Sequence, residues 1–319
     1  MYEALTESYE LVAGDNKTLS EAQKRARDYA RQALSKNTWK AYQCDLDHFT
    51  AWGGKIPSTP EKLTEYLSTF AGELAISTLS RRLASINKAH EMAGHPSPTT
   101  DQKVRLVMKG IRRAHSSKQK QASPLLRDDL ISICSQMTDE LKCKRDKALL
   151  LIGFAGALRR SELVALNIDD IEFLSEGVVL HIRKSKTDQE GRGRKIAIPK
   201  AKSQSRICPV KALKEWMDIL PSSDESVFRS VRKGTYVQPT RLSESAVSVI
   251  IKSHVKKIGL DPENYSGHSL RAGFCTSAAM MGLPEWKIMK QSGHKSHNVM
   301  MRYIRDARLF EDNPLDIIF

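Results

Sequence analysis

The chain has 319 residues, and its 51 Lys and Arg against 37 Asp and Glu give a formal net charge of +14 at pH 7, which favours a polyanionic partner such as nucleic acid. The length allows two domains of ~150 residues each, and the five cysteines are scattered without a Cys-x-x-Cys pair, which argues against disulfide-stapled domains and zinc sites. No signal-peptide pattern and no run of ~18 apolar residues occurs, so we expect a cytoplasmic, nucleoid-associated protein.

The first part of the chain has a helical pattern. Residues 1–20 are polar and acidic without a sustained period, which predicts a flexible tail. Within residues 21–115, four segments repeat apolar side chains at spacings of three and four, as a helix with one buried face does. They begin near Trp39, Thr59, Ser77 and Asp101. We therefore expect residues 21–115 to form a helical DNA-binding domain.

Basic residues concentrate at the end of this domain. Seven Lys and Arg and no acid occur from Lys103 to Lys120. A solvated helix face is the ordinary explanation of a charge run, but such faces usually mix both signs, so contact with phosphates is favoured. The candidate DNA-binding residues on the third and fourth predicted helices are Arg81, Arg82, Lys88, Lys109, Arg112 and Arg113.

A polar segment over residues 116–124 ends at Pro124 and predicts a linker to a second domain, residues 125–319. In that domain β-branched residues alternate over 178–182, and residues 195–199 follow after a polar loop as a return strand. Helical periodicity then resumes. The expected fold is mainly α with a small β-sheet or hairpin, in two domains that clamp duplex DNA.

The last fifty residues hold a candidate reaction site. His268 and Arg271 are three residues apart, so they share a helix face and can converge on one anion, such as a phosphate. His294 and Tyr303 follow, and a tyrosine phenol can act as a nucleophile against that phosphate. Each residue alone is more often structural: the tyrosine would suit a buried apolar stripe, and a lone histidine is usually a surface or core residue. Their joint order and spacing favour the catalytic interpretation.

An earlier segment completes a known pattern. Residues from Ala157 to Leu163 read Ala-Leu-Arg-Arg-Ser-Glu-Leu. Together with the later histidines, arginine and tyrosine, this segment resembles the catalytic domain of the tyrosine recombinases, or phage-integrase family, with Cre-like recombinases closest in appearance. The resemblance implies that Arg159 is the first catalytic arginine and that Glu162 helps to order the site.

The resemblance also implies a lysine on the β-hairpin. Lys186 matches best and Lys184 is the alternative, because alternation along a strand puts both on the same side. Cleavage of a phosphodiester builds negative charge on the non-bridging oxygens, which Arg159 and Arg271 would stabilise, while the lysine protonates the departing 5′-oxygen. No cofactor or metal is expected.

The two histidines receive separate roles from the same resemblance. His268 would help to move the proton off Tyr303, and His294 would hydrogen-bond a phosphate oxygen. The implied activity is site-specific recombination: DNA strands are cut and rejoined through a 3′-phosphotyrosyl intermediate and a Holliday junction, without ATP. The alternatives are a tyrosine-type topoisomerase that relaxes supercoils and a non-catalytic DNA-binding protein of the same fold.

The expected partner is double-stranded DNA with inverted-repeat sites, of the kind that a mobile element carries. The resemblance implies a homotetramer on this DNA. The apolar C-terminal tail, residues 308–319, either docks into a neighbouring protomer or packs on its own domain.

Overall fold

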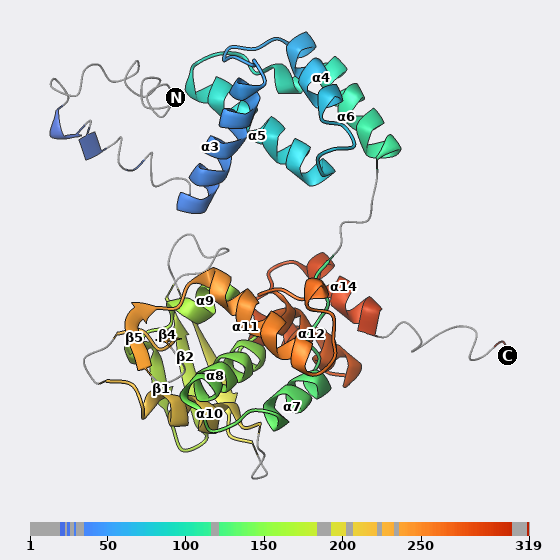
Figure 1. Ribbon diagram of the computed structural model, residues 1–319. Helices are drawn as coiled ribbons and strands as arrows, with labels where there is room; N and C mark the ends of the chain where they lie inside the picture. Colours follow the sequence, from blue (N-terminus) through green and yellow to red (C-terminus); the bar gives the residue numbers. More distant parts are fainter. Residues whose placement is uncertain are drawn as a thin grey trace. The chain divides into compact units, whose positions relative to one another are not determined.

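The structure is a computed structural model that describes residues 20–22, 24–25, 29, 35–115, 121–183, 193–201, 207–221, 225–232, 236–307 and 318. It divides into two compact units, Met1–Gln119 and Lys120–Phe319 (Figure 1). Apart from Ser20 and Ile318, both expected tails lie outside the described residues. So do residues 116–120 of the expected linker and residues 184–192, which include both candidate lysines.

Helices build the first unit and lie close to the positions expected from the sequence. They are α3 (Lys36–Ala51), α4 (Pro60–Thr69), α5 (Ile76–Met92) and α6 (Gln102–Ala114). Ser35, Thr59 and Asp101 cap three of them by accepting main-chain N–H hydrogen bonds of the first turn. Helix α3 packs on α5, and α4 packs on α6. Their apolar faces enclose a core around Phe49 and Tyr66.

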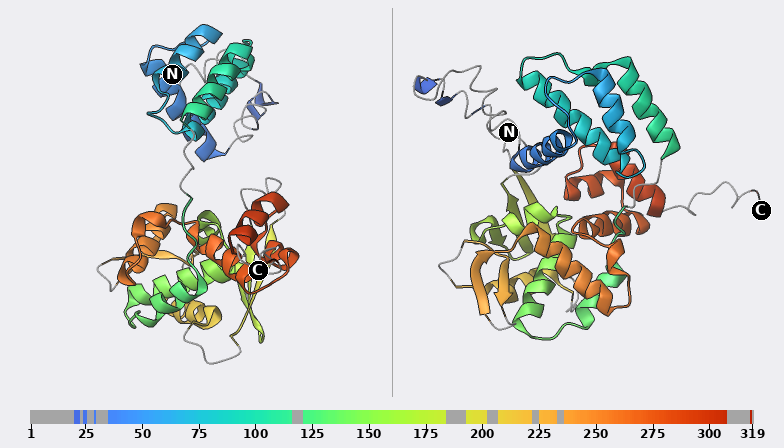
Figure 2. Two further views of the ribbon diagram at one scale, coloured as in Figure 1. Left: turned by 90° about the vertical axis from the view of Figure 1, so that its right-hand side faces the viewer. Right: turned by 45° about the horizontal axis from the view of Figure 1, so that its top comes forward.

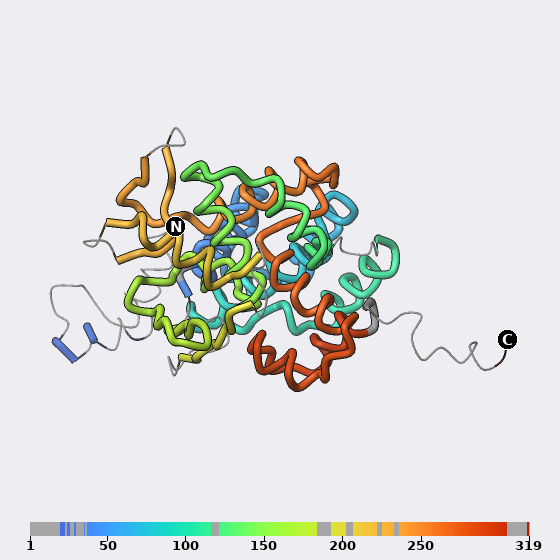
Figure 3. The backbone as a smooth tube through the Cα atoms, turned by 90° about the horizontal axis from the view of Figure 1, so that it is seen from below, coloured from blue at the N-terminus to red at the C-terminus, as the bar shows by residue number. Residues whose placement is uncertain are grey.

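The second unit is also mainly helical, as expected. Its helices are α7 (Arg127–Ser135), α8 (Leu141–Ala155), α9 (Arg160–Ala165), α10 (Pro209–Met217), α11 (Glu244–Lys257), α12 (Ser269–Met280), α13 (Glu285–Ser292) and α14 (His297–Ala307). Helix α8 is buried against α10 and α12, and α12 also contacts α13 and α14. Figure 3 shows the two last helices, in red, lying together beside α12.

The expected strands form a small antiparallel sheet in the order β1 (Ile171–Phe173), β2 (Gly177–Ile182) and β3 (Arg194–Pro199). Leu180 of β2 pairs with Ile196 of β3, so their side chains share the buried face. The left view of Figure 2 shows this ribbon beside the helices. In the described part of the chain, no helix is long and apolar enough to cross a membrane.

The expectation of helical periodicity after the first hairpin was wrong over one segment. Strands β4 (Arg229–Arg232) and β5 (Tyr236–Arg241) form a second antiparallel pair. Strand β5 buries none of its residues, and its sequence contains Pro239. The alternation of apolar and polar residues that reveals a half-buried strand is therefore missing.

Helix α12 approaches the start of the second domain through a glycine. A Cβ added at Gly273 would lie 1.7 Å from the Leu125 carbonyl oxygen, and the Leu125 N–H donates to the Ser269 carbonyl oxygen at 2.9 Å. Only a residue without a side chain permits this approach. Gly110 in α6 offers a contrast, since a Cβ there would meet nothing within 4 Å.

We expect Gly273→Ala to lower the free energy of unfolding of the second unit by about 1–3 kcal/mol, because the new methyl group must displace backbone. The matched variant Gly110→Ala should instead stabilise the first unit by about 0.5–1 kcal/mol through helix propensity. Urea denaturation of both variants checks this. Equal effects of the two substitutions would contradict the packing argument.

Candidate active site

Arg271 lies in the first turn of α12 with its side chain almost fully buried. Its Nη1 donates to the Ala157 carbonyl oxygen at 2.7 Å and to the Ser292 carbonyl oxygen at 2.5 Å. Its Nη2 is buried and has no hydrogen-bond partner among the described residues. Burial, followed by the charge of Arg159, lowers the pKa of Arg271 to about 10, so the group stays cationic at neutral pH. A buried cation with an open donor is suited to bind an anion.

Glu162 organises a second cationic group at the start of α9. This carboxylate is buried and accepts from Arg159 twice, at 3.0 Å from the main-chain N–H and at 2.6 Å from Nη1. The neighbouring Arg160 is more exposed and pairs with Glu244 at 3.3 Å. Arg159, rather than Arg160, is therefore the arginine that Glu162 holds in the site of Arg271.

Arg194 is a site residue that sequence reasoning missed. It begins β3, and its Nη2 donates to Glu162 at 3.2 Å, so two guanidiniums share one carboxylate. The available signal was strand alternation: Arg194 lies two residues before Ile196 and therefore on the buried face of the strand. The return strand was expected to begin at Lys195, which left Arg194 in the polar loop, whereas β3 begins at Arg194.

The turn before α9 holds an unusual backbone conformation. Ala157 has φ +46°, in the left-handed region that disfavours residues with a side chain. Its carbonyl oxygen is the one that accepts from Arg271. The strained turn is therefore part of the structure that holds the buried arginine.

Tyr303 reaches the site from α14. Its Oη lies 2.9 Å from Nε2 of His268, whose side chain keeps an exposed edge. Burial raises the pKa of Tyr303, so its phenol is protonated at neutral pH. Burial, and then the charges of Arg271 and Arg159, lower the pKa of His268, so its imidazole is neutral. A neutral imidazole at this distance can accept the phenol proton.

His294 follows a sharp turn at the end of α13. Gly293 ends that helix with φ +68°, and Nδ1 of His294 lies 2.7 Å from the Ser292 hydroxyl. The rings of His294 and Tyr303 are 5.8 Å apart between centroids. Burial, followed by Arg271 and Arg159, lowers the pKa of His294 to about 3. The free site therefore holds this imidazole neutral.

The structure thus brings the candidate catalytic residues of the second domain into one site, with the exception of the lysines at 184 and 186, which lie outside the described residues. The gathered residues are Arg159, His268, Arg271, His294 and Tyr303, with Glu162 and Arg194 beside them. Within the described ranges, no group of three His, Cys, Asp or Glu side chains is arranged to hold a metal ion.

The candidate DNA-binding residues of the first unit differ in exposure. On α6, the side chains of Lys109, Arg112 and Arg113 are exposed. On α5, Lys88 pairs with Glu91 at 3.3 Å, and Arg81, which is partly exposed, pairs with Asp45 at 2.9 Å.

Arg82 was expected to contact DNA, and the structure corrects this. It is only 8% exposed, and its Nη1 donates to the Tyr66 hydroxyl at 3.0 Å inside the helical unit. The sequence contained the reason, because Arg82 lies three residues after Leu79 and four before Ile86, on the apolar stripe of α5.

Known proteins are similar to this chain in sequence. The family model described as "Phage integrase family" matches residues 125–309. The integrase/recombinase xerD homolog of Selenomonas ruminantium is 38% identical over 304 residues, 92% of this chain and 89% of that protein. The recombinase Cre of Escherichia phage P1 is 29% identical over 315 residues, 88% and 90% of the two chains. The expected relation to Cre is confirmed, and the xerD homolog shares a higher identity.

A solved structure extends the agreement to the fold. The crystal structure of a lambda integrase tetramer bound to a Holliday junction covers 98% of this chain and 88% of that one, with a TM-score of 0.62 and 18% sequence identity. This likeness shows that the two proteins share a fold.

We expect Ala157→Gly to raise the free energy of unfolding by about 1 kcal/mol, because glycine removes the left-handed strain while its carbonyl still accepts from Arg271. Ala246→Gly, in the ordinary helix α11, should be destabilising by about 1 kcal/mol. Thermal or urea unfolding measures both effects. A destabilised Ala157→Gly variant would contradict the strain assignment.

The lowered pKa of His294 predicts a pH-dependent stability. Because the folded protein resists protonating this ring, its contribution to stability is complete above pH 6.5 and is lost progressively as the pH falls toward about 3. His294→Gln should therefore lose less stability than the parent protein across this window in urea titrations. If His294→Gln loses as much stability as the parent, the lowered pKa of the half-buried His294 ring is disproved.

Proposed function

The chain belongs to the phage integrase family and is a tyrosine recombinase, and on that premise we propose that it recombines specific DNA sites with Tyr303 as its nucleophile. The observation that carries the proposal is the contact of Tyr303 Oη with His268 Nε2 at 2.9 Å. The same site holds Nη2 of Arg271, which has no hydrogen-bond partner among the residues that the structure describes. A proton acceptor, a nucleophile and an anion-binding cation then meet at one place.

In this mechanism the Tyr303 oxygen attacks a phosphorus atom of the DNA backbone. The phenol proton passes to His268, and the bond between phosphorus and the 5′-oxygen breaks. The departing 5′-oxygen takes a proton from the hairpin lysine, for which Lys186 remains the better candidate and Lys184 the alternative. A 3′-phosphotyrosyl bond results. It replaces one phosphodiester by another, so a 5′-hydroxyl of a second strand can reverse the reaction without ATP.

The guanidiniums of Arg159 and Arg271 stabilise the charge that builds on the non-bridging oxygens. Both are always charged at neutral pH and donate in fixed directions, so they favour the transition state over the ground state. Arrival of the phosphate also offsets the arginine charges around His294. Its pKa then rises toward the ordinary range, and a protonated Nε2 can donate to a phosphate oxygen.

We assign DNA binding in the first unit to the exposed basic side of α6, with Lys109, Arg112 and Arg113 as its phosphate contacts. Arg81 and Lys88 on α5 are further candidates. Each pairs with a carboxylate, so binding a phosphate would require breaking that ion pair. The family resemblance implies inverted-repeat sites of a mobile element as the substrate. Affinity that comes chiefly from phosphates falls steeply with salt.

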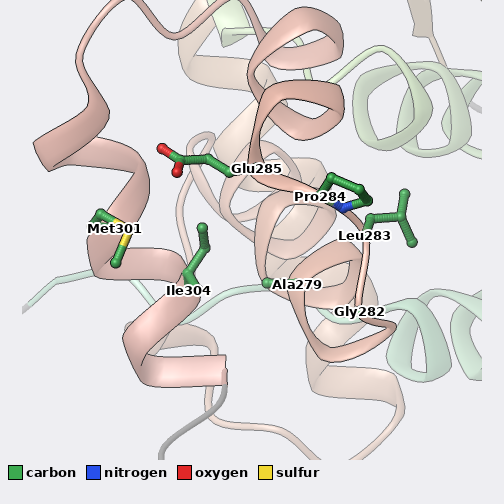
Figure 4. A pocket seen from close by; sticks show the side chains of 7 residues that line it. All are labelled: Ala279, Gly282, Leu283, Pro284, Glu285, Met301 and Ile304. Carbon is green, nitrogen blue, oxygen red and sulfur yellow. The ribbon is translucent and has the colours of Figure 1, made fainter.

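A groove in the second unit supports assembly of several copies (Figure 4). It has a volume of about 270 Å³ and is lined by Ala279, Gly282, Leu283, Pro284, Glu285, Met301 and Ile304. Met281 and Trp286 nearby are 66% and 62% exposed. Such an exposed apolar surface favours a partner.

We propose that this groove receives the C-terminal tail, residues 308–319, of a second copy of the chain. The tail is rich in Leu, Ile and Phe, and Ile318 is 67% exposed. The lambda integrase structure is a tetramer on a Holliday junction, and a cyclic exchange of tails would build a comparable assembly here.

Covalent trapping tests the nucleophile. The parent protein, incubated with nicked duplex DNA from its own locus and then denatured, should form an adduct at a defined 3′-phosphate. Tyr303→Phe should form none, whereas Tyr236→Phe, an exposed tyrosine on β5, should react like the parent. Adducts spread over all sequences would favour the topoisomerase alternative. Tight binding with no adduct on any DNA would favour a non-catalytic binding protein.

Deleting residues 308–319 should abolish the tetramer on paired sites while a single site is still bound. Leu283→Asp, which puts a charge in the groove, should have the same effect, because a buried carboxylate without a partner is costly. Leu174→Asp, an exposed position in the β1–β2 turn, is the control. Light scattering or native electrophoresis measures the assembly. Tetramers that survive the deletion would mean that the tail packs on its own domain.

A further inference from the structure

Arg194 connects two parts of the site that come from distant segments of the sequence. Its Nη2 donates to Glu162 at 3.2 Å, and its Nη1 donates to the Gln291 carbonyl oxygen at 3.0 Å. Its side chain is only 22% exposed. One guanidinium therefore bridges the carboxylate that orders Arg159 to the last turn of α13.

The fit of Arg194 depends on a glycine. A Cβ added at Gly293 would lie 2.5 Å from Nη1 and 2.9 Å from the central carbon of the guanidinium. Gly293 also has φ +68° and closes α13, with its N–H donating to the Met289 carbonyl oxygen at 2.7 Å. The guanidinium thus occupies the space that a side chain at position 293 would fill.

The bridged turn carries two other site contacts. The Ser292 carbonyl oxygen accepts from Arg271, and the Ser292 hydroxyl lies 2.7 Å from Nδ1 of His294. A shift of this turn away from Glu162 would therefore move the supports of Arg271 and His294 relative to Arg159. Its contact with Glu162 places the charge of Arg194 inside the site, and burial, partly offset by Glu162, lowers the pKa of this guanidinium.

We propose that Arg194 is a positioning residue for strand cleavage, which holds the Ser292–His294 turn against Glu162 and so fixes the distance between the groups that receive the phosphate. The inference rests on the proposed function, since it concerns the same cleavage step. Arg194 acts through Glu162 and the turn, and it is not required to touch DNA.

The first test compares two variants of Arg194, Arg194→Ala and Arg194→Lys, with the control Lys195→Ala. Lys195 is exposed and lies on the opposite face of β3. At saturating nicked DNA, Arg194→Ala should cleave on the order of 30-fold more slowly, because small misplacements of catalytic groups are costly. Arg194→Lys should recover part of the rate, since a lysine can pair with Glu162 but lacks the two separate terminal nitrogens that reach Glu162 and Gln291. Lys195→Ala should cleave like the parent. DNA affinity should change by less than about 2-fold in all three.

A chemically altered substrate identifies the step. When sulfur replaces the bridging 5′-oxygen at the cleaved phosphate, the leaving group no longer needs a proton. Variants impaired only in leaving-group protonation should regain their rate, so Lys186→Ala should be rescued. Arg194→Ala should remain slow, because its defect lies in the placement of the phosphate-binding groups. Rescue of Arg194→Ala would overturn the proposal, and so would a parent-like rate on the ordinary substrate.

A double-mutant cycle separates positioning from general damage. Gly293→Ala alone should slow cleavage, since its methyl group collides with the Arg194 guanidinium and its φ is unfavourable. In the Arg194→Ala background the collision is removed, and the added effect of Gly293→Ala should shrink to the part caused by φ. Independent, multiplying effects would contradict the bridge. If Arg194→Ala does not fold, Arg194→Lys and Gly293→Ala still provide the test. If Tyr303→Phe also forms adducts, the proposed function fails instead.

Discussion

The site depends on the burial of the Arg271 guanidinium. A cation in the interior is stable only when most of its donors are satisfied, and here two main-chain carbonyl oxygens, of Ala157 and Ser292, accept from Nη1. The remaining Nη2 has no partner among the residues that the structure describes. An incoming phosphate oxygen would complete its hydrogen bonding. Much of the cost of burying the charge is thereby borne by the folded protein before DNA arrives, which is the arrangement that electrostatic catalysis requires.

Other features of the second unit follow from this arrangement. The carbonyl of Ala157 points to Arg271 from a turn that an alanine adopts only with strain. The carbonyl of Ser292 does so from a turn that Gly293 and Arg194 hold in place. The guanidinium charges also help to lower the pKa values of both histidines, which keeps His268 neutral and able to accept the proton of Tyr303. The buried charge of Arg271 thus depends on the two backbone turns and in turn keeps His268 ready to accept a proton.

Patterns carried by neighbouring residues were predictable from the sequence, and contacts between distant residues were not. Thr59 and Pro60 predicted the start of α4. The candidate site was predicted from the order and spacing of His268, Arg271, His294 and Tyr303. Strand alternation could have placed Arg194 on the buried face of β3, but its contacts with Glu162 and Gly293 join distant segments that only the fold brings together. The position of Arg82 in the helical repeat of α5 predicts a buried side chain. The neighbouring basic residues led instead to the expectation that Arg82 contacts DNA. Strand β5 lacked the alternation that a buried face imposes.

In the proposed mechanism, Arg271 neutralises a non-bridging oxygen of the cleaved phosphate. The most direct test is cleavage of DNA in which a methylphosphonate, which lacks that negative charge, replaces the phosphate at the cleavage site. Arg271→Ala should be nearly inactive on ordinary DNA and should regain cleavage on the methylphosphonate, whereas Tyr303→Phe should remain inactive on both. If Arg271→Ala is equally impaired on the two substrates, the arginine does not act on the phosphate charge.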